Sequence, residues 1–136
     1  MKYANFFENI NKETTIHEFS TVFDLKAKFK DPFHEVEGIV EIFKIFQKMY
    51  ENLDNPKFKI LETVSDRNIS YIRWEFSFSF KKQKEVQNFI GLSRVIFNAE
   101  NKAIIHEDFW DAGENIYEKI PFISCIIKFV KNKIKS

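Results

Sequence analysis

The segment ISYIRWEFSFSF, residues 69–80, alternates between two kinds of side chain along its whole length. One set is apolar and comprises Ile72, Trp74, Phe76, Phe78 and Phe80. The other set is mostly polar and comprises Tyr71, Arg73, Glu75, Ser77 and Ser79. Successive side chains of a strand point to opposite faces of a sheet, so the pattern predicts a long strand with one face on a core and the other toward water.

The sequence on either side of this segment extends the sheet and adds helices. Runs typical of strands cover 57–64, 85–99 and 103–111, and turn-forming residues at 81–85 and 98–102 predict antiparallel hairpins between them. Residues 23–29 predict a further strand, with Phe23, Leu25, Ala27 and Phe29 on its buried face. Helical signals cover about 2–9, 14–21 and 39–53. This order predicts an α+β fold, with a curved antiparallel sheet and helices packed on one face.

Composition limits the function classes. A chain of 136 residues fits one domain over 1–136, and a net charge of +1 gives no field that favours nucleic acid. The single cysteine, Cys125, excludes an intrachain disulfide and a cysteine-based zinc site. We read no secretory signal and no membrane-length apolar run, and therefore expect a cytoplasmic protein. The 17 Phe indicate either a thick core with an apolar cavity or codon bias.

The segment KFKDPFHEVEG, residues 28–38, contains a candidate functional carboxylate. Pro32 biases Asp31 toward an extended conformation, and Phe29 and Phe33 flank Asp31 with apolar surface. One interpretation is a carboxylate directed toward a pocket, with a pKa raised by its apolar surroundings. The alternative is a turn residue that accepts backbone hydrogen bonds. His34 alone fits a solvated surface histidine.

The segment IIHEDFWD, residues 104–111, is the richest in chemistry. Strand alternation places His106, Asp108 and Trp110 on one face. A histidine beside a carboxylate can act as a general base, because the carboxylate fixes the tautomer of the imidazole. The alternative is a structural pair that ties this strand to the N-terminal helices. Nothing in the spacing of Asp31, His34, His106 and Asp108 requires them to converge, so we expect no metal and no cofactor.

The C-terminal residues 119–136 predict a basic amphipathic helix. Its apolar stripe contains Ile120, Ile123, Ile127, Val130 and Ile134, and its opposite face contains Lys128, Lys131 and Lys135. Such a helix can lie on an anionic membrane surface. We favour the alternative, in which the stripe packs on the domain or in a dimer.

The order of elements, together with FKDPFHEVEG, GLSRVIFNAENKAIIHEDFWD and YEKIP, resembles the nuclear transport factor 2-like superfamily. This is the cone-shaped fold of ketosteroid isomerases, limonene epoxide hydrolases and SnoaL-type polyketide cyclases, with N-terminal helices on the concave face of the sheet. The likeness covers about residues 3–121. It implies a homodimer formed through the sheet and an aromatic cavity for an apolar or polycyclic small molecule.

The resemblance also implies roles for particular residues. Asp31 lies where ketosteroid isomerases have their general-base aspartate, and the two donors of the oxyanion hole would fall at Phe7 and Ser93. Phe7 cannot donate a hydrogen bond, which disfavours steroid isomerisation. Arg73, Glu75 and Asp108 have the spacing of an epoxide hydrolase triad, but alternation turns Arg73 and Glu75 away from the aromatic face.

These observations predict a small-molecule-binding domain, with acid–base isomerase, cyclase or hydratase-like activity as a further option. The candidate catalytic residues are Asp31, His106 and Asp108. The candidate ligand-binding residues are Phe29, Phe33, Trp74, Phe76, Ser93 and Trp110. The alternative is a non-enzymatic interaction module that docks through its sheet face or through residues 119–136.

Overall fold

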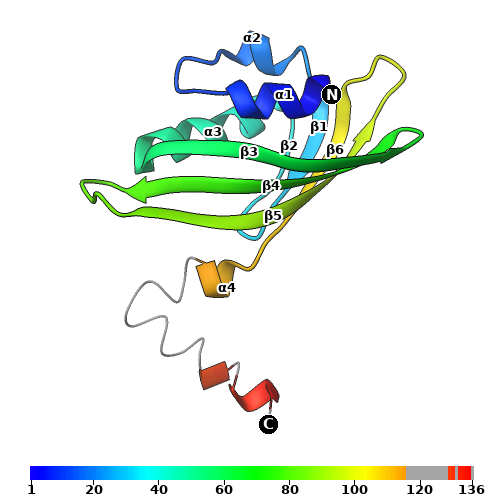
Figure 1. Cartoon of the computed structure of the whole chain (residues 1–136). Helices are drawn as coiled ribbons and strands as arrows, with labels where there is room; N and C mark the ends of the chain where they lie inside the picture. Colours follow the sequence, from blue (N-terminus) through cyan, green and yellow to red (C-terminus); the bar gives the residue numbers. More distant parts are fainter. Residues whose placement is uncertain (116–128, 131, 136) are drawn as a thin grey trace.

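The computed structural model describes residues 1–115, 129–130 and 132–135. Six strands form one curved sheet in the order β2-β1-β6-β5-β4-β3 (Figure 1). The strands are β1 (Phe23–Lys30), β2 (Glu35–Glu37), β3 (Leu53–Asp66), β4 (Ile69–Phe80), β5 (Val86–Phe97) and β6 (Ala103–Phe109). The helices are α1 (Lys2–Asn9), α2 (Ile16–Phe19), α3 (Ile39–Asn52) and α4 (Ala112–Asn115). The predicted α+β class is confirmed.

Strand β4 has the two faces that its alternation predicts. It pairs antiparallel with β3 and β5 along its whole length. Its inward side chains Ile72, Trp74, Phe76 and Phe78 are buried against the core. Tyr71 lies on the outer face and is exposed. The period-two pattern therefore sets the register of the sheet, since a slip of one residue would turn every aromatic ring toward water.

Strand β1 differs from its sequence pattern in two ways. It pairs parallel with β6, with Phe29 opposite His106, although its other neighbour β2 is antiparallel. The register with β6 shifts between Phe23 and Lys28, and within this irregular stretch Leu25 is 68% exposed. The prediction that Leu25 shares the buried face of Phe23 and Ala27 is therefore wrong, because the pairing of β1 with β6 is irregular at Leu25, while Ala27 and Phe29 remain buried.

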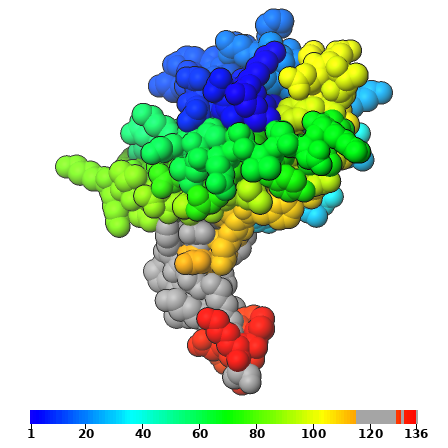
Figure 2. Space-filling model, turned by 45° about the vertical axis from the view of Figure 1, so that its right-hand side comes forward, coloured from blue at the N-terminus to red at the C-terminus, as the bar shows by residue number. Residues whose placement is uncertain are grey.

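The N-terminal helices cover the concave face of the sheet. Helix α1 directs Tyr3 and Phe7 into the core, and α3 directs Ile39, Ile42 and Phe46 into it. Figure 2 shows α1, in blue, lying against β3, in green. Helix α2 begins at a capping box in which Thr15 and Glu18 each accept the other's backbone N–H, as the sequence predicts. Tyr3 and Phe7 lie one helical turn apart, so α1 places two rings over the same part of the sheet.

The C-terminal prediction lies mostly outside the described residues. The predicted helix over 119–136, including Cys125, is described only at 129–130 and 132–135, which are helical. There the side chains of Phe129, Val130 and Ile134 are exposed. Within the described part of the chain, no helix is long and apolar enough to cross a membrane.

Candidate functional site

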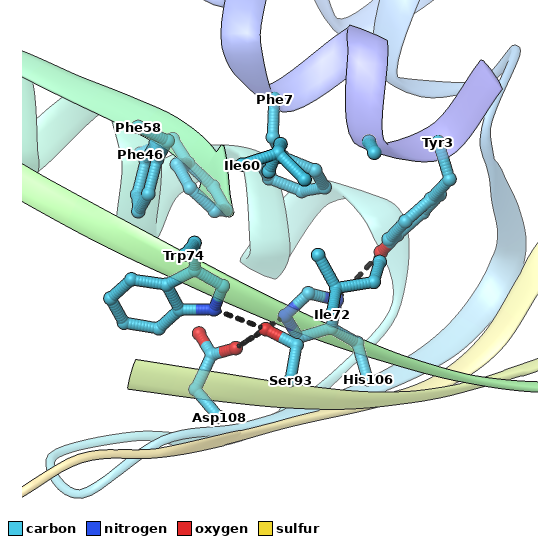
Figure 3. Close-up of a pocket in the computed structure, with 11 residues that line it drawn as sticks. Tyr3, Phe7, Phe46, Phe58, Ile60, Ile72, Trp74, Ser93, His106 and Asp108 are labelled. Atoms are coloured by element: carbon cyan, nitrogen blue, oxygen red, sulfur yellow. Dashed lines mark hydrogen bonds and ion pairs between the residues drawn. The ribbon is translucent and has the colours of Figure 1, made fainter. Parts of the chain in front are cut away.

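A cavity between the concave face of the sheet and helix α1 brings together the polar side chains of the interior (Figure 3). Its wall is mostly apolar and comprises Ala4, Phe7, Phe46, Phe58, Ile60, Ile72 and Trp74. Its polar side chains are Tyr3, Ser93, His106 and Asp108. Helix α1 contributes Tyr3, and the neighbouring strands β5 and β6 contribute the other three.

His106 and Asp108 form the centre of the polar group. They lie two residues apart on β6, so both side chains point to the concave face. His106 Nε2 lies 2.7 Å from Asp108 Oδ1. On the other side of the imidazole, the Tyr3 hydroxyl lies 2.7 Å from His106 Nδ1. The His106 side chain is 5% exposed and that of Asp108 is 15% exposed, so only the carboxylate has appreciable access to solvent.

Ser93 and Trp74 extend the group across the sheet. Ser93 lies opposite Asp108 in the β5–β6 pair, and its hydroxyl contacts Asp108 Oδ1. The Trp74 indole Nε1–H donates to Ser93 Oγ at 2.8 Å. Gly91 makes room for this arrangement, because a Cβ at Gly91 would lie 2.3 Å from the Trp74 ring atom Cη2. Tyr3, His106, Asp108, Ser93 and Trp74 therefore form one continuous chain of hydrogen bonds, here named the polar chain.

The chemistry of each group assigns the hydrogens in the polar chain. Trp74 can only donate, so Ser93 Oγ accepts from it and gives its own hydrogen to the Asp108 carboxylate. An ionised carboxylate only accepts, so a neutral His106 places its hydrogen on Nε2. Nδ1 is then left to accept the Tyr3 O–H. Burial raises the pKa of Tyr3 well above its usual value, and the nearby Asp108 charge adds to this, so the phenol keeps its hydrogen.

The two oxygens of Asp108 have different environments. Oδ1 accepts from both Ser93 and His106. Oδ2 takes part in none of the hydrogen bonds among the described residues. Figure 3 shows the contacts of Asp108 on one oxygen, while the other lies on the Trp74 side. The polar chain therefore fixes the orientation of a carboxylate and leaves one of its oxygens for another group.

The cavity is small. Its volume is about 20 Å³. Pockets for drug-sized ligands have about 300–1,000 Å³, so this cavity is far smaller than a drug-sized site. Aromatic rings fill the rest of the interior, with Phe7 in edge contact with Phe58 at 6.0 Å between centroids. The expectation that the cavity holds a polycyclic molecule therefore does not fit this arrangement.

Asp31 lies apart from the cavity and is not part of its lining. Its Oδ1 accepts the backbone N–H groups of Phe33 at 2.8 Å and His34 at 2.7 Å. The His34 ring also contacts the carboxylate, with Nδ1 3.0 Å from Oδ1. These bonds are those of a turn residue, so the structure does not bring Asp31 to His106 and Asp108.

The predicted aromatic residues have three different positions. Phe29 stacks on His106 with 4.9 Å between ring centroids, so it packs against one face of the imidazole. Phe76 is buried against Phe58 in the core, at 4.7 Å. Phe33 contacts Trp110 at 5.3 Å, and Trp110 contacts Phe89 at 4.8 Å. Phe29, Phe33, Phe76 and Trp110 therefore do not line the cavity, whereas the predicted Trp74, Ser93, His106 and Asp108 do.

Tyr3 is the residue that sequence reasoning missed. The resemblance directed attention to Phe7 as the position of a phenol donor, and Phe7 has none. Tyr3 lies four residues earlier, which is one helical turn, and thus on the same face of α1. This spacing is the signal that could have identified it. In the described part of the chain, no group of three or more His, Cys, Asp or Glu side chains is arranged to hold a metal ion.

Comparisons with known proteins agree with this fold. Residues 3–106 match a family model described as a SnoaL-like domain. A hypothetical protein from Catenulispora acidiphila with a ketosteroid isomerase-like fold, solved in complex with trimethylamine, has a TM-score of 0.71 and 10% identity, over 84% of this chain and 85% of that one. An NTF2-like protein of unknown function from Exiguobacterium has a TM-score of 0.68 and 16% identity, over 81% and 95%.

A third structure is a candidate SnoaL-like polyketide cyclase from Jannaschia. It has a TM-score of 0.69 and 7% identity, and the similarity covers 79% of this chain and 81% of that one. No curated protein matches the sequence significantly. At these identities the structural similarities establish the nuclear transport factor 2-like fold, which by itself does not specify a chemistry.

Proposed function

The chain belongs to the SnoaL-like domain family, and we propose that it binds a small organic molecule in the cavity at Asp108. The observation that carries this proposal is the unequal use of the two carboxylate oxygens. Oδ1 is held by Ser93 and His106, while Oδ2 is left without a hydrogen bond from the described residues. The Asp108 side chain is 15% exposed and an ionised carboxylate oxygen needs a hydrogen-bond donor, so a ligand group or a water is expected on Oδ2.

The surroundings of Asp108 favour an organic ligand over a structural role alone. The wall is apolar with a few convergent polar groups, which is the usual composition of a small-molecule site. A protein with the same fold was solved with trimethylamine, a small organic molecule. The volume of about 20 Å³ limits the group that enters to a few atoms, unless aromatic side chains move.

A second candidate function is proton transfer, and the His106–Asp108 contact of 2.7 Å favours it. A carboxylate whose position is fixed by two donors could remove a proton from a bound molecule. Removal of a proton beside a carbonyl also needs donors for the developing oxyanion. The hydrogens of Tyr3 and Ser93 are already donated within the polar chain. We therefore place binding ahead of enolising chemistry.

The experiment is an NMR titration that follows the indole N–H of Trp74, which lies in the cavity wall. The probes are methylammonium, tert-butanol, acetone and acetate, which cover a cation, a neutral donor, an acceptor and an anion. At least one probe should shift this resonance saturably in the wild-type protein, and Asp108→Asn should alter that response. The matched control, Asp66→Asn, replaces an exposed aspartate at the end of β3 and should respond as the wild type does.

Two outcomes would overturn the proposal. One is that no probe shifts the Trp74 resonance at any concentration that leaves the protein folded. The other is that Asp108→Asn and Asp66→Asn respond identically. Exchange of the methyl protons of acetone in D₂O tests proton transfer separately. Exchange faster in the wild type than in Asp108→Asn would support the catalytic candidate.

A further inference from the structure

We infer that the ligand group received at Asp108 is a small ammonium group, that is, a cation that donates hydrogen bonds. This inference rests on the proposed binding at Asp108 and names the chemical class of the ligand. Its basis is the donor and acceptor inventory of the cavity, its charge and its aromatic wall. Each of these is set by described residues.

When His106 is neutral, every polar side-chain hydrogen of the described cavity wall is already in use. Tyr3 donates to His106, and His106 donates to Asp108. Trp74 donates to Ser93, and Ser93 donates to Asp108. With neutral imidazole, these four side chains have no other polar hydrogen to offer. A carbonyl, a carboxylate or an oxyanion that entered the cavity would therefore find no side-chain donor unless the polar chain were broken.

The available group is an acceptor with negative charge. Asp108 Oδ2 is not engaged by the described residues, and none of the described residues that line the cavity is a Lys or an Arg. With a neutral His106, the ionised Asp108 gives the site one negative charge. A ligand with N–H groups and a positive charge would satisfy both the lone pairs and the charge of the carboxylate. Charge-assisted hydrogen bonds of this kind are about twice as strong as neutral ones.

The apolar part of the wall also suits a cation. Trp74 and Phe58 both line the cavity, and their rings meet edge to face at 5.7 Å between centroids. The face of an aromatic ring attracts an ammonium group within about 6 Å of its centroid. A desolvated ammonium group therefore gains from these rings, whereas an acetate of similar size would be repelled by both the rings and Asp108.

The cavity volume limits the size of the group. A volume of about 20 Å³ exceeds what one water needs and is too small for a bulky head group. Methylammonium, with one carbon and one nitrogen, is the matching probe. Trimethylammonium has a larger head group and would require the wall to move. We therefore expect a primary ammonium group to be preferred over a trimethylated one.

The test is a titration of the folded full-length protein with methylammonium chloride, followed at the Trp74 indole N–H. Potassium chloride at equal ionic strength is the salt control, and acetone and acetate are the probes of opposite character. Methylammonium should shift the resonance saturably, and acetone and acetate should not. Trimethylammonium chloride should bind at least a few-fold more weakly than methylammonium, since the wall must move to admit it.

The variant Asp108→Asn gives a second and sharper test. Its carbonyl oxygen can keep the hydrogen bonds of Ser93 and His106, which places the amide NH₂ where Oδ2 was. The free group then changes from acceptor to donor. Methylammonium binding should weaken at least about tenfold, and acetone should begin to bind. Asp66→Asn should leave both affinities within about twofold of the wild type, as expected for a surface change.

The outcomes separate this inference from the proposed function. Saturable binding of acetone or acetate, with no binding of methylammonium, would overturn the ammonium inference and leave small-molecule binding at Asp108 intact. Absence of binding by every probe would overturn both. Because the wild-type probe series needs no substitution, poor folding of Asp108→Asn would not prevent a decision.

Discussion

Replacement of Gly91 by alanine should disturb both the stability and the polar chain. A Cβ at Gly91 would lie 2.3 Å from Cη2, 2.4 Å from Cζ2 and 2.8 Å from Cζ3 of Trp74. These distances are far below van der Waals contact, so the indole must move. The opposing wall offers little room, because Trp74 contacts Phe58 on one side and Phe89 on another. Displacement of the indole would also break its hydrogen bond to Ser93.

The magnitude follows from these two effects. Overpacking of a dense core costs about 1–3 kcal/mol. Loss of the hydrogen bond between Trp74 and Ser93 adds about 1 kcal/mol. The free energy of unfolding should therefore fall by about 2–4 kcal/mol. For a chain of this length that corresponds to a decrease in Tm of roughly 10 °C.

Urea denaturation of the wild type, Gly91→Ala, Trp74→Phe and the double variant measures the loss of unfolding free energy. It also tests whether the clash with the Trp74 ring causes that loss. Phe lacks the outer ring atoms that clash, so Trp74→Phe should recover most of the overpacking cost of Gly91→Ala and give a coupling energy of at least about 1 kcal/mol. An additive double variant would refute the steric reasoning. So would a Gly91→Ala protein whose Tm and Trp74 indole N–H resonance match those of the wild type.

Other substitutions test the role of Asp31, the buried hydroxyl of Tyr50 and the formation of a homodimer. Asp31→Ala should lower the free energy of unfolding by about 1 kcal/mol, because it removes the hydrogen bonds from the backbone N–H groups of Phe33 and His34. It should leave methylammonium binding unchanged, and a loss of binding would show that Asp31 has a role in the pocket. Tyr50→Phe removes a buried hydroxyl without a partner among the described residues, so it should be neutral or stabilising by up to about 1 kcal/mol, and a clear loss would reveal a hidden partner. Burial raises the pKa of Tyr50 to about 12, above the value of about 10 in an unfolded chain, so the free energy of unfolding should fall as the pH rises from about 10 to 12. In Tyr50→Phe, which lacks this ionisation, the free energy of unfolding should fall less steeply over the same range. Leu92 and Phe109 lie opposite each other on the outer sheet face and both are exposed, so we expect a homodimer through this face. The wild type should sediment at twice the chain mass of 16.3 kDa, and Leu92→Lys should dissociate the dimer. A wild-type protein that sediments only at 16.3 kDa would contradict this expectation.

The sequence contained enough to predict most strands of the sheet and four of the five residues of the polar chain, namely Trp74, Ser93, His106 and Asp108. Strict alternation in β4 sets its buried face, because period two leaves only two choices and one of them exposes every aromatic ring. The same rule put His106 and Asp108 on one face of β6. The ketosteroid isomerase resemblance pointed to Ser93. These residues lie on regular strands, where local pattern and tertiary direction agree.

The rest depended on information that is not local. The irregular pairing around the exposed Leu25 is between β1 and a strand more than 70 residues later in the sequence. Tyr3 joins the site only through the rotation of α1 over the sheet. Asp31 in a DPF segment is equally consistent with a pocket and with a turn, and the geometry of the backbone N–H groups decides between them. The cavity volume depends on how many aromatic rings meet in the interior, which composition alone does not state.

The most direct measurement is a high-resolution crystal structure of the protein grown with methylammonium chloride. We expect the methylammonium nitrogen about 2.7–2.9 Å from Asp108 Oδ2, with the four hydrogen bonds of the polar chain retained. A water on Oδ2 with methylammonium bound elsewhere, or an Asp108 carboxylate turned out of the cavity, would contradict the claim that this site receives a small cation.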